Sequence, residues 1–399
     1  MTNEMATRTA CVHAGREDFA ALRVHAAPLD LSSTYPLGSP EAAEHAFDVF
    51  GAGGVDEEEP VYGRLHNPTV ARFERAVAGL ERCEASVAFA SGMAALTACL
   101  LALEADAREV VAIRPLYGGC DHLLGSALLG ARVRWARPET VAEAITPSTG
   151  LVLLETPQNP TLGLVDVEAV VAAARGVPVL VDNTFATPIL QNPVDQGAAL
   201  VVHSASKLLG GHGDVMAGVV ATSEERARRL RRIRIATGSL LHPLAAYLLL
   251  RSLPTLPLRV REAQAGASAL AVRLAAHPLV ARVDYPGLPG ADPHGLLGRQ
   301  LRGPGSVLSF EVVGGRAAAD AVLAGLRLVT PAVSLGSTDT LVQRPAGLTH
   351  RFVDPSALAE GGISPGLLRL SIGLEDPDDL WGDLAQALDA AVPALAVAF

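Results

Sequence analysis

From about residue 87 to residue 220, the sequence alternates short apolar segments with helix-like ones. Six segments have the length and composition of strands, and several are apolar without interruption: 86–89, 109–113, 132–135, 151–155, 177–182 and 200–204. Helical spacing of apolar residues occurs between them, at 94–103, 119–129 and 166–174. Uninterrupted apolar strands are typical of a parallel sheet with helices on both faces. The pattern predicts an α/β fold whose ligands bind at the carboxyl ends of the strands.

The sequence on either side of this block lacks the regular alternation of strand-like and helix-like segments. Residues 1–61 look irregular, and their acidic, Gly-rich stretch 51–59 is expected to be a mobile loop. After about residue 250, a long helical segment reaches residue 276, strand-like segments follow at 280–285, 307–312 and 367–372, and helix-like segments lie at 317–326 and 376–392. We therefore expect an N-terminal arm (1–61), a central α/β domain (62–250) and a smaller C-terminal α/β domain (251–399).

Charge and cysteine content narrow the functional classes. A net charge of -10 argues against nucleic acid or an anionic membrane as a partner, because both favour basic surfaces. The arginines between Arg226 and Arg234 are expected to form a solvated helix face. The 4 cysteines form no C-x-x-C pair and no secretory signal is visible, so we expect a cytoplasmic protein with reduced thiols. No H-E-x-x-H motif or Cys/His cluster indicates a metal.

Only one of the 32 basic residues is a lysine, Lys207. An arginine does not deprotonate near neutral pH and is a poor nucleophilic amine, so a function of Lys207 can depend on its amine. Ser204 and Ser206 flank it and can bind an anion nearby. An amine beside an anion site is what an imine with pyridoxal phosphate requires. The alternative is an ordinary surface lysine that follows a strand.

Two other strand ends carry candidate ligands for such a cofactor. Asp182 ends an apolar strand, where a carboxylate needs a partner such as a pyridinium N–H; the alternative is a carboxylate that caps a turn. Gly92 and Met93 open the helix after strand 86–89, and their N–H groups could bind phosphate. The alternative there is a plain helix start with Ser91 as its N-cap.

Aromatic and basic residues complete the candidate site. Tyr117 follows strand 109–113 and could stack on a flat ring, while Tyr62 and Arg64 could reach a phosphate. Arg369 lies within an apolar strand, where its charge calls for a buried anion such as a substrate carboxylate.

Together these segments resemble the pyridoxal-phosphate-dependent Cys/Met metabolism (trans-sulfuration) family, which includes cystathionine γ-lyase, cystathionine γ-synthase, methionine γ-lyase and O-acetylhomoserine sulfhydrylase. The resemblance extends from residues 13–15 to residues 373–376. The matching segments follow the family order: YGRLHNPT (62–69), ASGMAA (90–95), LYGG (116–119), ETPQNP (155–160), VDNTFATP (181–188), SASKLLGGHGD (204–214), SLGSTDTL (334–341), LTH (348–350) and LRLSIGLED (368–376).

The resemblance implies the type I fold of pyridoxal-phosphate-dependent transferases, the aspartate aminotransferase-like fold, with a mainly parallel seven-stranded sheet and a smaller C-terminal domain. It implies that Lys207 holds pyridoxal 5'-phosphate covalently and later transfers protons. Asp182 would pair with the pyridine nitrogen, and Tyr117 would stack on the ring and assist loss of the γ-substituent.

The resemblance also assigns the remaining contacts. The cofactor phosphate would be bound by Gly92, Met93, Ser204 and Ser206, with Tyr62 and Arg64 from a neighbouring subunit; the carboxylate of a small amino-acid substrate would be bound by Arg369, Asn159 and Ser334. A site shared across subunits implies a homodimer whose N-terminal arms contact the neighbour, and the family commonly forms a tetramer of two such dimers.

Several positions depart from the family pattern. His66 replaces a frequent glycine, and Ser206 replaces a threonine but keeps a hydroxyl. Gly119 stands where methionine γ-lyases carry a cysteine, which disfavours that activity. His122 lies where cystathionine-handling members have arginine, and Asp339 where they have glutamate. These two changes leave the recognition of the distal end of the substrate open.

The expected reaction is elimination at Cγ of a sulfur amino acid, of the cystathionine γ-lyase type, which gives an α-keto acid, ammonia and a thiol. The alternatives are γ-replacement, as in cystathionine γ-synthase or O-acetylhomoserine sulfhydrylase, and methionine γ-lyase activity. A dinucleotide-dependent oxidoreductase is disfavoured because no G-x-G-x-x-G follows a strand. A non-enzymatic cofactor-binding scaffold is disfavoured by the presence of Lys207, Tyr117, Asp182 and Arg369.

Overall fold

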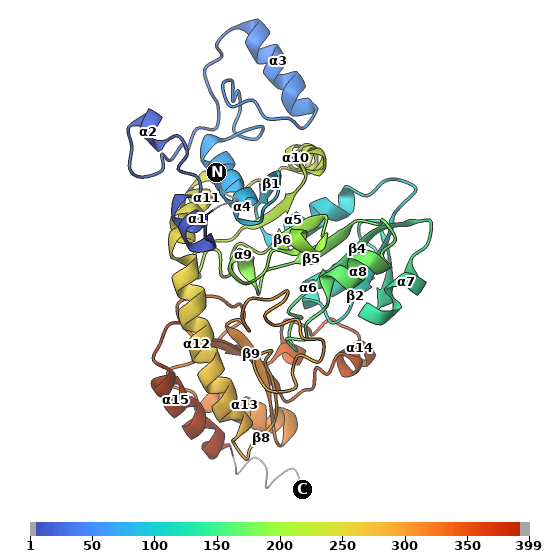
Figure 1. The fold of residues 1–399 in the computed structure, drawn as a ribbon, viewed down its shortest axis with the longest axis vertical. Coiled ribbons are helices and arrows are strands. Elements are labelled where there is room, and N and C mark those ends of the chain that lie inside the picture. Colours follow the sequence, from blue (N-terminus) through green and yellow to red (C-terminus); the bar gives the residue numbers. More distant parts are fainter. Residues whose placement is uncertain (1–4, 392–399) are drawn as a thin grey trace.

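The computed structural model describes residues 5–391 and contains one large and one small β-sheet (Figure 1). The first four residues of the predicted arm, the last eight of the predicted C-terminal domain and the end of the predicted helix 376–392 lie outside this range.

The large sheet has seven strands in the order β1-β7-β6-β5-β4-β2-β3. Only β7 among them runs against its neighbours, so the other six all point the same way. The predicted α/β fold with a mainly parallel seven-stranded sheet is therefore confirmed. The strands are β1 (Ala85–Phe89), β2 (Glu109–Ile113), β3 (Arg132–Ala136), β4 (Thr149–Glu155), β5 (Val179–Asp182), β6 (Leu200–His203) and β7 (Gly218–Thr222).

Helices cover both faces of this sheet, which explains its uninterrupted apolar strands. Successive side chains point to opposite faces: in β1, Val87 and Phe89 pack in one apolar cluster and Ala88 packs in another. The first face is covered by α5 (Gly92–Leu101), α6 (Gly118–Gly125) and α10 (Glu224–Thr237). The second face is covered by α4 (Pro68–Leu80), α7 (Val141–Ala144), α8 (Val167–Ala173) and α11 (Pro243–Ser252), with the short α9 (Thr187–Leu190) nearby.

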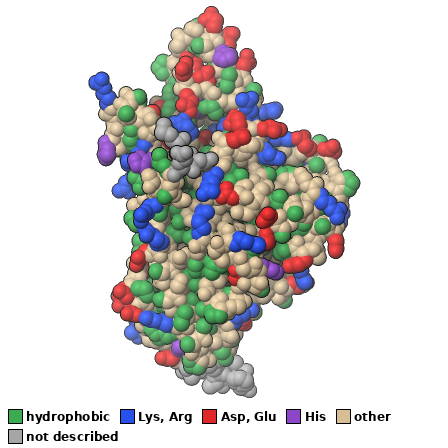
Figure 2. All heavy atoms as spheres, viewed as in Figure 1, with side chains coloured by type: hydrophobic (Ala, Val, Ile, Leu, Met, Phe, Trp, Pro, Cys, Tyr) green, Lys and Arg blue, Asp and Glu red, His purple; other side chains and the backbone are tan. Residues whose placement is uncertain are grey.

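The N-terminal region is partly helical, so the prediction of an irregular segment was wrong. It contains α1 (Thr7–His13), α2 (Phe19–Leu22) and α3 (Pro40–Gly51). Helix α3 begins where the Ser39 side chain accepts a hydrogen bond from the Ala42 N–H and Pro40 occupies the first turn. It projects from the rest of the molecule, and acidic side chains gather on this projection (Figures 1 and 2).

The acidic stretch 51–59 packs against two helices. The Arg231 side chain of α10 donates to the Gly53 carbonyl at 3.2 Å, and Arg75 of α4 pairs with Glu57. A Cβ at Gly53 would lie 2.1 Å from the Arg228 carbonyl oxygen, so only glycine fits this approach. These contacts argue against a freely mobile loop.

The prediction that the Arg226–Arg234 cluster is a solvated face holds only in part. Arg231 and Arg234 are buried. Arg231 pairs with Glu224, and Arg234 pairs with Glu74 and donates to the Ala88 carbonyl. Sequence analysis did not reveal these pairs because Glu74 lies on another helix and Glu224 lies about two turns away on the same helix.

The smaller sheet has the order β10-β11-β12-β9-β8. Helix α12 (Leu256–Ala275) runs alongside both parts of the molecule, and its second half packs with α13 and α15 on the small sheet (Figure 1). The elements are β8 (Val280–Asp284), β9 (Val307–Val312), α13 (Gly315–Gly325), β10 (Thr330–Pro331), β11 (Leu341–Gln343), α14 (Pro355–Glu360), β12 (Leu367–Ser371) and α15 (Pro377–Ala390). Among residues 5–391, no helix has the length and apolar content needed to cross a bilayer.

Candidate active site

A cavity of about 600 Å³ opens at the carboxyl ends of the parallel strands. Strands β1, β2, β4, β5 and β6 all end at this edge, so the segments that follow them converge there. Ten of the twelve predicted site residues line it: Gly92, Met93, Tyr117, Asn159, Asp182, Ser204, Ser206, Lys207, Ser334 and Arg369.

One end of the cavity is rich in hydrogen-bond donors. Helix α5 begins there, and Ser91 accepts from the Ala94 N–H as its N-cap. A Cβ on Gly92 would lie 2.9 Å from Ser204 Cβ, so glycine is needed for the helix to approach the Lys207 loop this closely. A helix N-terminus with nearby hydroxyls is a suitable site for a phosphate.

The Ser206 hydroxyl is held by the backbone. It accepts from the Ala217 N–H at 2.8 Å and lies 3.2 Å from the Ala217 carbonyl, to which it donates. To donate to a phosphate instead, the hydroxyl would have to release this carbonyl.

Two neighbouring carboxyls line the cavity, the buried Glu155 and the partly buried Asp182. They face each other in register on β5 and β4, and Asp182 accepts from the Thr184 N–H at 2.9 Å. Burial raises the pKa of Asp182, and it raises the pKa of Glu155 well above its usual range, with the Asp182 charge adding to the effect. A cationic partner for Asp182 would favour its charged form.

Glu155 is a site residue that the sequence analysis missed. Its Oε1 accepts from the Tyr117 N–H at 2.7 Å and so positions the loop that carries the Tyr117 ring. The sequence did contain a signal, because Glu155 ends an apolar strand in the same way as Asp182. Cys120 also lines the cavity, and burial raises the pKa of its thiol well above the usual range.

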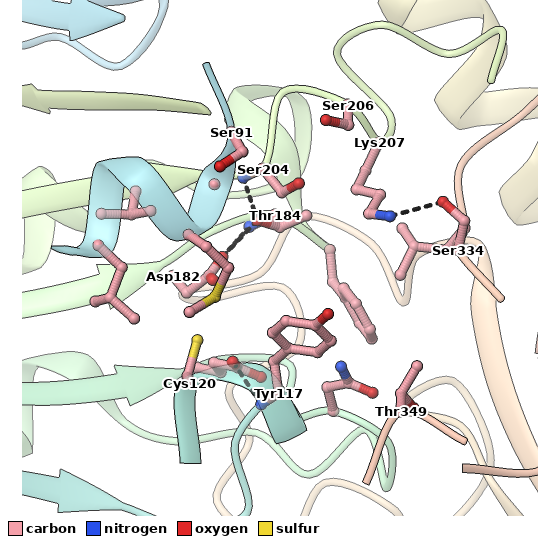
Figure 3. A pocket seen from close by; sticks show the side chains of 18 of the residues that line it. Ser91, Tyr117, Cys120, Asp182, Thr184, Ser204, Ser206, Lys207, Ser334 and Thr349 are labelled. Atoms are coloured by element: carbon pink, nitrogen blue, oxygen red, sulfur yellow. Dashed lines mark hydrogen bonds between the residues drawn. The ribbon is translucent and has the colours of Figure 1, made fainter. Parts of the chain in front are cut away.

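Lys207 faces Ser334 across the cavity (Figure 3), and its Nζ donates to the Ser334 Oγ at 2.6 Å. Burial, and then the positive charge of Arg369, lower the pKa of Lys207. A larger fraction of this amine is therefore neutral, and hence nucleophilic, than in a free lysine at the same pH.

Arg369 lies at the other end of the cavity, where only 2% of its surface is exposed. Its Nη1 donates to Asn159 Oδ1 at 2.8 Å and its Nη2 to the Ser334 carbonyl at 2.9 Å. Its buried Nε has no partner among the residues that the structure describes. A buried guanidinium without a carboxylate partner is suited to bind a carboxylate ligand.

His350 is a second residue that the sequence analysis did not single out. It is buried, its Nε2 donates to the Leu116 carbonyl at 3.0 Å, and burial together with Arg369 lowers its pKa to about 4. It is therefore neutral at physiological pH and fixes the loop before Tyr117. Only the contact across the fold reveals this function, because position 350 is remote from position 116 in sequence.

Tyr62 and Arg64 do not line the cavity of their own chain. Arg64 donates to the Ile235 carbonyl at 3.2 Å, and its guanidinium lies 5.6 Å from the centre of the Tyr62 ring. Tyr62 is 42% exposed. Their predicted contact with a cofactor phosphate therefore requires a second subunit.

The described residues fit pyridoxal phosphate. The cavity has hydroxyl and N–H donors for a phosphate and a partly buried carboxyl group for a ring nitrogen. It also has an aromatic side chain that could stack on the ring and an amine of lowered pKa for the aldehyde. The individual contacts remain predictions.

Comparison with known proteins agrees with this fit. Residues 8–389 match the family described as Cys/Met metabolism PLP-dependent enzyme. An L-methionine gamma-lyase of Streptomyces avermitilis is 56% identical over 382 residues, which cover 95% of this chain and 88% of the relative. An L-methionine gamma-lyase of Brevibacterium sandarakinum is 53% identical over 391 residues, 97% of this chain and 98% of the relative.

Solved structures extend the comparison to the fold. A cystathionine gamma synthase from Xanthomonas oryzae pv. oryzae superposes with a TM-score of 0.90 at 36% identity, covering 98% of this chain and 100% of the other. The type I fold, the lyase class and the dependence on pyridoxal phosphate predicted from the sequence are thereby confirmed. The chain belongs to the pyridoxal-phosphate-dependent enzymes of Cys/Met metabolism.

Proposed function

We propose that this enzyme catalyses γ-elimination from L-methionine, giving methanethiol, 2-oxobutanoate and ammonia. From the sequence alone, methionine γ-lyase activity was an alternative to the expected cystathionine γ-lyase type. Two findings favour methionine: relatives above 50% identity carry the name L-methionine gamma-lyase, and apolar side chains line the opening of the cavity.

The charge distribution in the cavity carries this proposal. The charged side chains that line it are Glu155, Asp182, Lys207 and Arg369. The first three lie at the predicted cofactor position, and Arg369 is needed for the substrate α-carboxylate. Among residues 5–391, no further charged lining residue is available for the second amino-acid head group of cystathionine.

Apolar side chains line the opening instead. Met216, Val333 and Leu348 line the cavity and are at least half exposed, at 70%, 52% and 52%. The S-methyl group of methionine carries no charge, so it would contact these side chains without giving up hydrogen bonds to water. The second amino-acid head group of cystathionine is zwitterionic, so it would lose water without gaining a charged partner.

The two positions that differ from the family pattern at the distal end of the substrate, His122 and Asp339, also favour methionine. His122 is exposed on α6 and does not line the cavity; its ring packs against Phe352 in a tilted arrangement, with ring centroids 5.7 Å apart. Asp339 is exposed and also lies outside the lining. Cystathionine-handling relatives carry arginine and glutamate at these two positions. Here neither His122 nor Asp339 places a charge inside the cavity.

The absence of a cysteine at position 119 has a structural explanation. A Cβ on Gly119 would lie 2.6 Å from Cε1 of Tyr117. The Tyr117 ring therefore occupies the space that a cysteine side chain would need. We propose that the position of this ring, rather than a thiol, is what methionine elimination requires here.

Bound pyridoxal phosphate supplies an electron sink that makes the substrate Cα–H and Cβ–H acidic. The protein residues divide the remaining work. Arg369 would hold the α-carboxylate, the Lys207 amine would accept and return protons at Cα and Cβ, and the Tyr117 hydroxyl would protonate the leaving thiolate.

A substrate panel tests the proposed reaction. Purified holoenzyme is incubated with methionine, cystathionine, homocysteine and O-acetylhomoserine, with and without added thiol, and keto acid and thiol are quantified. We expect methionine to give the highest kcat/KM, without dependence on added thiol. Faster turnover of cystathionine would overturn the methionine assignment, and strict dependence on thiol would indicate γ-replacement, which the similarity to cystathionine gamma synthase makes the second candidate.

We further propose a homo-oligomer with active sites shared between subunits, because Tyr62 and Arg64 lie outside the cavity of their own chain. The four cysteines, all free, support the predicted cytoplasmic location.

A further inference from the structure

The C-terminal domain contains a second cavity, of about 710 Å³, between β8, β9, α13 and α14. Four arginines line it, Arg282, Arg316, Arg344 and Arg351, against one acidic lining residue, Glu311. None of these residues takes part in the active site described above.

The arginines are not equally neutralised. Arg282 contacts Asp284 at 3.1 Å and Glu311 at 3.7 Å. Arg344 and Arg316 both use their Nε to contact one carboxylate, Asp320, at 2.9 and 3.4 Å.

The guanidinium groups of Arg344 and Arg351 therefore have N–H donors that are available to a ligand. The side chain of Arg344 is only 15% exposed, and within residues 5–391 its two Nη atoms have no acceptor. The Arg351 guanidinium has no ion-pair partner in the same range. Positive charges that line one cavity repel one another, so this lining favours binding of an anion with two negative charges.

The rest of the lining adds a polar contact and an apolar surface. The Oγ of Ser364 is buried and has no hydrogen-bond partner among the described residues. Pro355, Leu358 and Ile363 form an apolar side of the same cavity. The lining therefore matches a ligand that has a compact anionic group and an apolar body.

One segment separates this cavity from the active site. The second cavity is lined by Ala346, Gly347 and Arg351. The active-site cavity is lined by Leu348 and Thr349, which lie between Gly347 and Arg351 in the sequence.

The same segment is packed tightly on the loop that carries Tyr117. A Cβ on Gly118 would lie 1.9 Å from the Thr349 carbonyl oxygen. The Nε2 of His350 also donates to the Leu116 carbonyl. A shift of this segment would therefore move the Tyr117 loop.

We propose that the second cavity binds a small phosphate monoester whose body presents an apolar ring face, as the adenine of AMP does, and that binding changes the kinetic constants of the active site. Arg344 and Arg351 would hold the phosphate, with Arg316 as a further cation of the lining and Ser364 as a further donor. Pro355, Leu358 and Ile363 would contact the body. Displacement of segment 344–351 would transmit binding to Tyr117.

Isothermal titration calorimetry on the holoenzyme tests binding, with AMP, inorganic phosphate and adenosine at matched ionic strength as probes. Loading with pyridoxal phosphate beforehand keeps these probes out of the cofactor site. We expect AMP to bind more tightly than inorganic phosphate and adenosine not to bind. Arg316→Ala/Arg351→Ala should weaken AMP binding at least about tenfold, because two cavity cations are lost.

Both substituted side chains are exposed, so folding should be preserved. Arg232→Ala, an exposed arginine of α10 outside the cavity, is the matched control and should bind AMP like the wild type. Absence of AMP binding, or equal loss in the control, would overturn the site. Equal affinity for AMP and inorganic phosphate would overturn the apolar contact.

Kinetics test the coupling. With the amino acid that the substrate panel identifies, saturating AMP should change KM at least about twofold in the wild type and leave the double variant unaffected. Unchanged kinetics despite binding would overturn the coupling. Because binding is measured without substrate, failure of the methionine assignment would not be confused with failure of this site.

Discussion

Ser334 has a backbone φ of 97°, a conformation that side-chain-bearing residues rarely adopt, and its hydroxyl accepts from Lys207. Ser334→Ala and Ser334→Gly both remove the hydroxyl, but only glycine relieves the backbone strain. We expect Ser334→Gly to be more stable than Ser334→Ala by about 1 kcal/mol, with kcat/KM lowered by roughly tenfold in both.

Urea denaturation and steady-state kinetics of the two variants check this expectation. Equal stability would show that the φ angle stores no strain. Retained activity in both variants would show that Lys207 does not depend on this contact.

The lowered pKa of Lys207 predicts a pH dependence. Because the amine becomes neutral below the usual lysine range, condensation of the apoenzyme with pyridoxal phosphate should reach its half-maximal rate at a lower pH than with free lysine. Arg369→Gln removes the second cause of the lowered pKa, so the midpoint should move to higher pH.

Stopped-flow absorbance across a pH series measures this midpoint. Arg369→Lys keeps the positive charge and serves as the control, with an unchanged midpoint. An Arg369→Gln profile that coincides with the wild type would rule out the charge effect.

Helix α10 illustrates how an element acquires contacts that its sequence does not reveal. Arg234 is buried and paired with Glu74 of α4, whereas Arg232 is exposed. Arg234→Ala would leave the Glu74 carboxylate buried without its cation and should lower the free energy of unfolding by about 3–5 kcal/mol. Arg232→Ala should change it by less than about 0.5 kcal/mol.

Chemical denaturation of both variants gives the comparison. A similar small loss in each would mean that the Arg234 pair contributes no more than a surface arginine.

Most of the elements that were predicted from the sequence have a clear apolar pattern of their own. The parallel strands were predicted because both faces of the sheet are covered, and so were the helices α5, α6 and α8 that connect them. The antiparallel strand β7 and the four-residue helices α7 and α9 were not predicted. Strands β10 and β11 were missed because they are short and lack an apolar pattern of their own; they form by pairing with each other and with β12. Helix α3 was missed because its buried face consists mainly of alanines, Ala43 and Ala46, beside Phe50.

At the scale of the whole molecule, a shared active site predicts complementation. Arg64→Ala impairs the site of the neighbouring subunit, and Lys207→Ala impairs its own. Each homodimer should be inactive or nearly so, but half of the dimers in an equal random mixture are mixed, and one of their two sites is intact. The mixture should regain about a quarter of wild-type activity.

Differently tagged subunits, mixed after reversible dissociation, allow the exchange to be verified independently. No recovery of activity in verified mixed dimers would show that Arg64 acts within its own chain or not at all.

The sequence by itself determined the family and the cofactor through its ordered motifs, and the amine because a single lysine leaves no other residue for an imine. It also determined the α/β sheet, through its apolar strands. Only the tertiary structure paired Glu155 with Asp182, placed His350 under the Tyr117 loop and gathered four arginines around a second cavity. These contacts join residues distant in sequence, and local periodicity contains no information about which strand ends and loops become neighbours in space.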